Sequence, residues 1–189
     1  MRDKRLSIKG FDDLSGDGLY SCLETVRKGT TMKEQKLIIR KAAKENIRDI
    51  GKISLEAFEY HNRLLPDFFA DKKEFDETPR YNELIDKENA VFLVALKEGV
   101  VAGYLLAMIS DKPWLKETPV CSLDEIGVLS SCRHQGIGTS LFNALKEECR
   151  KRKIRSITLN VYANNEQAID FYKKAGCRIR SFRMDMKTD

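Results

Sequence analysis

The sequence predicts an α/β or α+β protein, built as one central sheet with helices on its faces. Short apolar runs alternate with amphipathic stretches along the chain, in the order βα(α)βββαβαβ. Two neighbouring apolar runs within 89–109 are separated only by Lys97, Glu98 and Gly99, as in a β-hairpin. The length of 189 residues suits one domain, and 42% hydrophobic with 33% charged residues is typical of a soluble globular protein.

The first half of the chain supplies this hairpin and the elements before it. KLIIRKA, residues 36–42, is a short apolar run with two adjacent isoleucines and is predicted to be a strand. Residues 44–58 predict a helix because four apolar side chains fall on one side of it: Ile47, Ile50, Leu55 and Phe58. YNELIDKE, residues 81–88, is predicted to be a second short helix, and a further short helix is predicted within 18–26.

Three strands are predicted after the hairpin. CSLDEIGV, residues 121–128, follows a polar loop that contains two prolines. Residues 157–161 alternate between apolar and polar side chains, which places the apolar ones on one face of the sheet. Residues 177–186 alternate in the same way and are predicted to be a last strand or hairpin.

Two helices lie between these strands. Residues 138–153 and 166–175 both carry apolar side chains at spacings of three and four residues. These side chains are Ile137, Leu141, Leu145 and Cys149 for the first helix, and Ala168, Phe171, Tyr172 and Ala175 for the second. Gly176 then stands where a helix C-cap belongs.

Composition argues against several classes of protein. The five cysteines are odd in number and widely spaced, without a CxxC pair: Cys22, Cys121, Cys132, Cys149 and Cys177. Together with a count of only two histidines, this argues against a disulfide framework and against a metal centre. Reduced thiols fit a cytoplasmic protein. The sequence has no apolar stretch of membrane-spanning length and no signal-peptide core, so no membrane partner is expected.

The net charge of +5 is a mild excess that suits an anionic small ligand. The one dense basic run, Arg150 to Arg155, lies at the end of a predicted helix, where the helix dipole favours cations. We interpret this run as a solvated helix end. The alternative is a nucleic-acid-binding domain, which would show salt-dependent binding to DNA or RNA.

RHQGIGTS, residues 133–140, joins a predicted strand to a predicted helix. It is not a Walker loop, because it lacks the lysine and the spacing, and not a dinucleotide fingerprint, because Leu141 replaces the third glycine. A tight turn without a ligand is one interpretation. The other is an anion site, in which free N–H groups at a helix N-terminus, glycines without Cβ atoms and the cation of Arg133 surround a pyrophosphate.

Two motifs favour the anion site. Arg133-x-x-Gly136-x-Gly138 resembles the acyl-CoA signature of the GNAT superfamily of N-acyltransferases, whose core is [RQ]-x-x-G-x-[GA]. Downstream, the chain resembles the second motif of that family, V-x-x-x-N-x-x-A-x-x-x-Y-x-x-x-G. The matching residues are Val161, Asn165, Ala168, Tyr172 and Gly176.

The resemblance covers roughly residues 36–187, since LIIRKAAKENI is similar to the opening strand and helix of the family. Two positions depart from the usual pattern, Ser130 in place of a proline and Cys177 in place of a phenylalanine, and neither lies in the phosphate loop. We therefore predict an acetyltransferase domain at 36–189 and an N-terminal extension of unknown function at 1–35.

The resemblance implies a GNAT-like fold, with a mixed sheet in which two parallel strands, 121–128 and 156–161, splay apart around acetyl-CoA. In LDEIGV two acidic residues break the alternation directly before Gly127, which predicts a β-bulge, with an ordinary edge strand as the alternative. Acetyl-CoA is the implied acyl donor, and no metal is implied. The residues implied to bind it are Ile126, Gly127, Val128, Arg133, His134, Gln135, Gly136, Ile137, Gly138, Thr139, Asn165 and Tyr172.

The implied reaction is direct attack of an amine on the thioester. An alkylamine is mostly protonated at pH 7 and must lose a proton first, so a base is required. Asp124 and Glu125 are the candidate bases, with Asp124 favoured, and the alternative for each is a solvated or ion-paired acid. Asn160 stands where some relatives carry a glutamate, and an amide cannot serve as the base.

Tyr172 is the implied general acid, whose hydroxyl donates a proton to the leaving CoA thiolate; the alternative is a tyrosine that only completes the core. Asn165 is expected to cap its helix and, from the resemblance, to contact CoA. The backbone N–H of Val128 is the implied donor to the oxyanion.

The predicted function is transfer of an acetyl group from acetyl-CoA to a primary amine of a small molecule or a protein. The alternative is a non-catalytic acyl-CoA-binding sensor or scaffold module. The acceptor is expected to lie against 58–70 and 110–120, with candidate residues Glu59, His61, Asn62, Asp67, Phe68 and Phe69. The sequence does not determine the acceptor, the acyl chain preference or the oligomeric state, and a homodimer is allowed.

Overall fold

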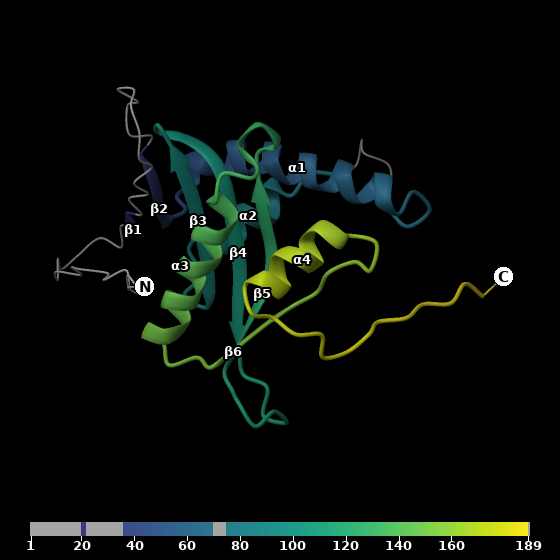
Figure 1. The fold of residues 1–189 in the computed structure, drawn as a ribbon. Helices are drawn as coiled ribbons and strands as arrows, with labels where there is room; N and C mark the ends of the chain where they lie inside the picture. Colours follow the sequence, from purple (N-terminus) through teal and green to yellow (C-terminus); the bar gives the residue numbers. More distant parts are fainter. Residues whose placement is uncertain (1–19, 22–35, 70–74, 189) are drawn as a thin grey trace, which may run out of the picture.

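A computed structural model describes residues 20–21, 36–69 and 75–188. Within these residues one six-stranded sheet has the strand order β1-β2-β3-β4-β5-β6 (Figure 1). Neighbouring strands are antiparallel except β5 and β6, which are parallel. The strands are β1 (Tyr20–Ser21), β2 (Leu37–Lys41), β3 (Ala90–Lys97), β4 (Val100–Ser110), β5 (Val120–Val128) and β6 (Ser156–Leu159). The mixed sheet confirms the predicted fold class.

Helices cover both faces of the sheet (Figure 1). The helices are η1 (Lys44–Asn46), α1 (Ile47–Leu64), α2 (Thr78–Leu84), η3 (Ser130–Cys132), α3 (Ile137–Lys151) and α4 (Glu166–Lys174). Buried residues of α1 and α2 form one hydrophobic cluster with the sheet, the α1-side core, and those of α3 and α4 form another, the α3-side core. None of the described helices combines the length and the apolarity that crossing a membrane requires.

The burial of the central strand β3 explains why its sequence is apolar from Ala90 to Leu96. Val91 and Leu93 enter the α3-side core, while Phe92 and Val94 enter the α1-side core. A strand that is buried on both faces has no solvent side to carry polar residues. The hairpin predicted within 89–109 is therefore confirmed as the middle of the sheet.

Two helices differ in length from their predictions. α1 runs to Leu64, beyond the predicted end at Phe58, because its last turns contact the segment after β6 through His61 and Tyr162, whose ring centroids lie 5.3 Å apart. α2 begins at Thr78 rather than at residue 81, with a proline in its first turn, where the missing N–H costs no hydrogen bond.

Two sequence predictions are wrong. Residues 177–188 contain neither strand nor helix, and the segment leads away from the sheet after α4 (Figure 1). Its alternating apolar residues have no partner face, since Ile179 is 62% exposed and Met184 is 90% exposed. In the predicted helix at 18–26, Tyr20–Ser21 is instead strand β1, paired with β2, and the remaining residues of that stretch lie outside the described part of the chain.

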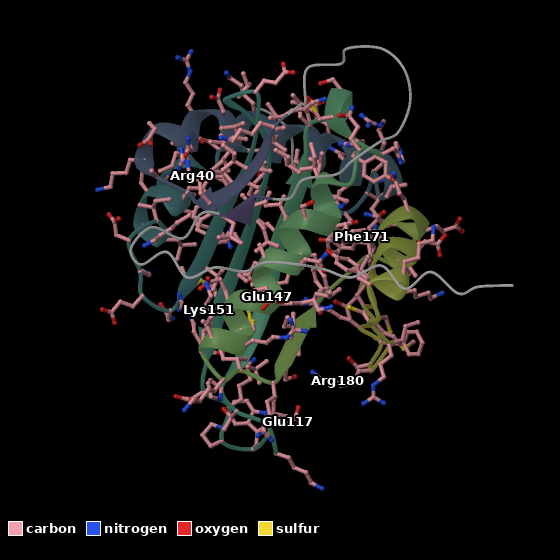
Figure 2. The ribbon with its side chains drawn as sticks, turned by 60° about the vertical axis from the view of Figure 1, so that its left-hand side comes forward. Arg40, Glu117, Glu147, Lys151, Phe171 and Arg180 are labelled. Carbon is pink, nitrogen blue, oxygen red and sulfur yellow. The ribbon has the colours of Figure 1, made fainter. Side chains whose placement is uncertain are left out.

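The basic run at the end of α3 is paired along the helix. Arg150 contacts Glu147, and Lys151 lies 3.4 Å from Glu148. Arg152 lies 3.8 Å from the same glutamate. Figure 2 labels Glu147 and Lys151 on this helix. These exposed ion pairs agree with the interpretation of the run as a solvated helix end.

Candidate active site

The loop between β5 and α3 presents a row of unpaired backbone N–H groups. Gly136 is the N-cap of α3 at a φ of 78°, a left-handed conformation that glycine adopts without strain. No side chain caps this helix N-terminus. Among the described residues, the N–H groups of 134–139 donate to no backbone acceptor. Free donors at the positive end of a helix form an anion site.

Side chains add charge around this loop. The half-buried Arg133 donates from Nε to the carbonyl of Val128 at 3.1 Å, and its terminal nitrogens have no hydrogen bond within the described chain. Gln135 accepts from Nζ of Lys97 at 2.7 Å. Lys97, at the end of β3, is a cation beside the loop that sequence reasoning missed, because it lies 38 residues before its partner.

The parallel strands separate as predicted. β5 and β6 are paired only from Val120↔Ser156 to Leu123↔Leu159. Beyond Leu123, β5 stays paired with β4 as far as Val128, whereas its other edge has no strand partner in the described structure. An unpaired strand edge offers backbone donors and acceptors to an extended ligand.

A β-bulge lies where the strands separate. Leu106 of β4 pairs with Glu125, and Ala107 pairs with Leu123, so Asp124 is the extra residue. This confirms the predicted bulge. Leu123 belongs to the α3-side core and Ile126 packs against it, while Glu125 contacts side chains of the α1-side core. The bulge thus directs the acids to the face opposite the glycine loop.

Glu125 is fixed by three donors. Its Oε2 accepts from the hydroxyl of Tyr81 at 2.6 Å and from that of Tyr104 at 2.8 Å, and its Oε1 accepts from the guanidinium of Arg80. A Cβ on Gly127 would come within 2.6 Å of the Tyr104 ring, so glycine is required for this tyrosine to pack there. Sequence reasoning missed all three donors.

Asp124 is less constrained than its neighbour. Its side chain is 33% exposed, and its Oδ2 lies 3.5 Å from Nη2 of Arg80. Burial raises the pKa of Asp124, the positive charge of Arg80 lowers it, and the negative charge of Glu125 raises it, with a net increase. A carboxylate with a raised pKa is a better proton acceptor than a free aspartate.

Tyr172 and Asn165 lie at opposite ends of α4. The ring of Tyr172 is 9% exposed and packs against Phe142 and Phe171. Burial raises its pKa to about 12, so the hydroxyl keeps its proton, and among the described residues it has no hydrogen-bond partner. Asn165 accepts from the N–H of Ala168 at 3.0 Å, which confirms the predicted cap.

Helix α1 crosses over the opening between β5 and β6. At one end of this crossing, Glu56 accepts from the N–H of Ser130 at 2.9 Å. Farther along, Nε2 of His61 lies 3.3 Å from Nδ2 of Asn165, and the carbonyl of Leu64 accepts from Asn164 at 3.4 Å. α1 therefore connects the end of β5 to the segment after β6 and bounds the opening from the face opposite α3.

The acceptor candidates divide into groups. His61, Phe68 and Phe69 form one aromatic cluster with Tyr162. An open hollow of about 440 Å³ lies beside them, lined by Phe58, Glu59, Asn62, Arg63 and Pro66. Asp67 is exposed and belongs to neither group.

The loop 110–120, expected against the acceptor, lies away from the opening between β5 and β6. This loop enters β5 at Val120, whereas the strands separate after Leu123 and β5 then runs away from the loop. Figure 2 shows Glu117 of this loop at the far end of the molecule from α1.

Comparison with known proteins agrees with this geometry. The chain matches the model of the acetyltransferase (GNAT) family over residues 55–177, more than half its length. The chain belongs to the GNAT family. The resemblance of the two motifs is thus confirmed, and the protein is an acetyl-CoA-dependent N-acetyltransferase of this family.

Several individual proteins are similar to this GNAT acetyltransferase. A Bacillus subtilis protein provisionally named a [ribosomal protein bS18]-alanine N-acetyltransferase is 29% identical over 110 residues, which cover 58% of this chain and 68% of that protein. An uncharacterised N-acetyltransferase of Methanocaldococcus jannaschii is 27% identical over 138 residues, 73% of this chain and 59% of that protein.

Solved structures share the fold at low identity. A Bacillus halodurans protein, solved as a tetramutant, superimposes with a TM-score of 0.73 at 22% identity, covering 79% of this chain and 99% of its own. An aminoglycoside N-acetyltransferase in complex with CoA superimposes with a TM-score of 0.63 at 17% identity, covering 87% of this chain and 99% of its own.

Proposed function

We propose that this acetyltransferase moves an acetyl group from acetyl-CoA to a primary amine by direct attack, with donor and acceptor on opposite faces of the sheet. The observation that carries the proposal is the opening between β5 and β6 beyond Leu123. The glycine loop lies on its α3 side, and the acids Asp124 and Glu125 lie on its α1 side.

The α3 side suits the donor. The unpaired N–H groups of 134–139 and the cation of Arg133 would hold the pyrophosphate. The free edge of β5 over 126–128 would pair with the pantetheine arm, and the N–H of Val128 would stabilise the oxyanion. The CoA contact proposed for Asn165 would add to the hydrogen bonds that its amide already makes.

The α1 side suits the amine. Asp124 would take the proton of the amine, directly or through a water molecule, because its carboxylate is partly exposed and its pKa is raised. The neutral amine would then attack the thioester carbon, and the C–S bond would break as the tetrahedral intermediate collapses. Tyr172 would give its proton to the departing sulfur, and the second proton of the attacking nitrogen would then restore the tyrosine hydroxyl, directly or through water.

Removal of the Tyr172 hydroxyl tests whether Tyr172 is the general acid. Tyr172→Phe is expected to lower kcat by about a hundredfold or more, because a positioned general acid typically contributes at least that much to the rate. The affinity for CoA is expected to fall much less than kcat, since the ring keeps its packing against Phe142 and Phe171. Thiol release and calorimetry measure the two quantities, and equal turnover in the two proteins would show that Tyr172 only packs.

An acceptor panel tests the function itself. The name of the Bacillus subtilis relative mentions an alanine of a ribosomal protein, so a peptide that begins with alanine and has a free amino group comes first, followed by a polyamine and an aminoglycoside. Free thiol release from acetyl-CoA is expected to accelerate with at least one of them. Tight CoA binding without turnover on any amine would favour the sensor or scaffold instead.

A further inference from the structure

The geometry points to Arg80 and Tyr81, on α2, as positioning residues that distinguish the two neighbouring acids. We propose that they hold Glu125 as a fixed hydrogen-bond acceptor, and that Arg80 sets the pH range in which Asp124 can act as the base. This inference rests on the proposed function, in which Asp124 accepts the proton of the amine. Neither α2 residue is taken to touch the substrate.

Glu125 is held as a hydrogen-bond acceptor at both of its oxygens. Its two oxygens accept from Tyr81, Tyr104 and Arg80, and its side chain is mostly buried. Burial and the charge of Glu125 raise the pKa values of both tyrosines, so both hydroxyls remain donors across the physiological range.

The tyrosines that hold Glu125 are themselves fixed. Tyr81 is fully buried, and its ring packs edge-on against Phe92 and Tyr104. Oγ of Ser54 lies 2.8 Å from the Tyr81 hydroxyl. Since the proton of Tyr81 points to Glu125, Ser54 is the donor in this second bond. The position of Glu125 is therefore set by α1, α2 and β4 together.

Arg80 joins three carboxylates. Its Nη1 donates to Glu77 at 2.9 Å and to Glu125, and its Nη2 faces Asp124 at 3.5 Å. Among the described residues, Asp124 interacts with Arg80 of α2 and with Glu125 and Cys121 of β5, while Glu77 of α2 and Tyr104 of β4 contact Arg80 and Glu125 respectively. Arg80 is the cation among them that opposes the increase in the pKa of Asp124.

Removal of the Arg80 cation is expected to change the titration midpoint of Asp124 measurably. In Arg80→Gln, the titration midpoint of Asp124 is expected to rise by about one pH unit, because a cation within about 6 Å is lost. Carbon-13 NMR of the carboxyl carbon follows this midpoint in the free protein, with Asp124→Asn for assignment. With the acceptor that the panel identifies, the acidic limb of kcat/KM is expected to move to higher pH by the same amount, and Arg80→Lys is expected to restore most of the shift.

The chain provides a matched control. Arg150 pairs with Glu147 at the same i,i+3 spacing that joins Arg80 to Glu77, but on the exposed side of α3. Arg150→Gln is expected to leave the Asp124 midpoint and the pH profile unchanged. Thermal unfolding and circular dichroism of each variant establish that it is folded.

Tyr81→Phe tests whether the hydrogen bond from Tyr81 positions Glu125. It removes one donor and keeps the buried ring, and it is expected to lower kcat several-fold without changing the KM for acetyl-CoA. Wild-type kcat in this variant would overturn the role given to Tyr81.

The outcomes separate this inference from the proposed function. An unchanged Asp124 midpoint in Arg80→Gln, with Asp124→Asn inactive, would refute the role of Arg80 and leave the proposed base intact. A shifted midpoint, with Asp124→Asn fully active, would refute Asp124 as the base and this inference with it.

Discussion

Gly136→Glu is expected to abolish CoA binding. The wild-type residue has a φ of 78°, at which any Cβ introduces strain of about 1–2 kcal/mol. More importantly, the new carboxylate would lie among the unpaired N–H groups of 134–139 and would repel the pyrophosphate that they are proposed to bind. Isothermal titration calorimetry with CoA measures the loss directly.

Gly176→Glu is the matched control for this prediction. Gly176 also has a positive φ, 93°, and a Cβ there would meet nothing within 4 Å. The two variants share the strain and the added charge, but only Gly136 lies in the loop. Normal CoA binding by Gly136→Glu would contradict the loop assignment, and equal loss in Gly176→Glu would attribute the effect to strain rather than to the site.

Asp124→Asn is expected to lower kcat by about a hundredfold or more, the effect of removing a general base. The amide keeps the shape of the side chain but cannot accept the proton. Because burial raises the pKa of Asp124, the acidic limb of the wild-type profile is expected above the range of a free aspartate, with activity lost as the pH falls through it. In Asp124→Asn this limb is expected to vanish from the residual rate.

Glu125→Gln tests whether the neighbouring acid, rather than Asp124, is the base. The amide can still accept from Tyr81 and Tyr104, so a smaller loss of kcat is expected than in Asp124→Asn. The reverse order, a nearly active Asp124→Asn and an inactive Glu125→Gln, would identify Glu125 as the base. Steady-state rates across pH decide between the two acids.

Site features carried by one short segment were predictable from the sequence. The break in alternation beside Gly127 predicted a bulge, which the structure places at Asp124, because a bulge changes which face the next side chain occupies. The glycine loop predicted a helix start at residue 138, one residue after the observed start of α3 at Ile137, and Asn165 predicted a cap, because both depend on neighbours within a few residues. The order of strands and helices followed from local periodicity in the same way.

Features that join distant segments were not predictable. Arg80 and Glu125 are 45 residues apart, and His61 and Asn165 are 104 residues apart, so periodicity carries no signal for either contact. The strand predicted at 177–186 is the opposite case, in which the local pattern was present but no strand formed. Its alternation meets the pattern of a half-buried strand, but no described strand lies beside it to supply hydrogen bonds and a buried face.

The most direct test of the account is mass spectrometry of the amine after incubation with acetyl-CoA. The wild-type protein is expected to add one acetyl group to an amine of the panel, and Gly136→Glu is expected to add none. Asp124→Asn is expected to form the same product far more slowly. The absence of an acetylated product with every amine tested, from wild-type protein that binds CoA tightly, would contradict the proposed transfer.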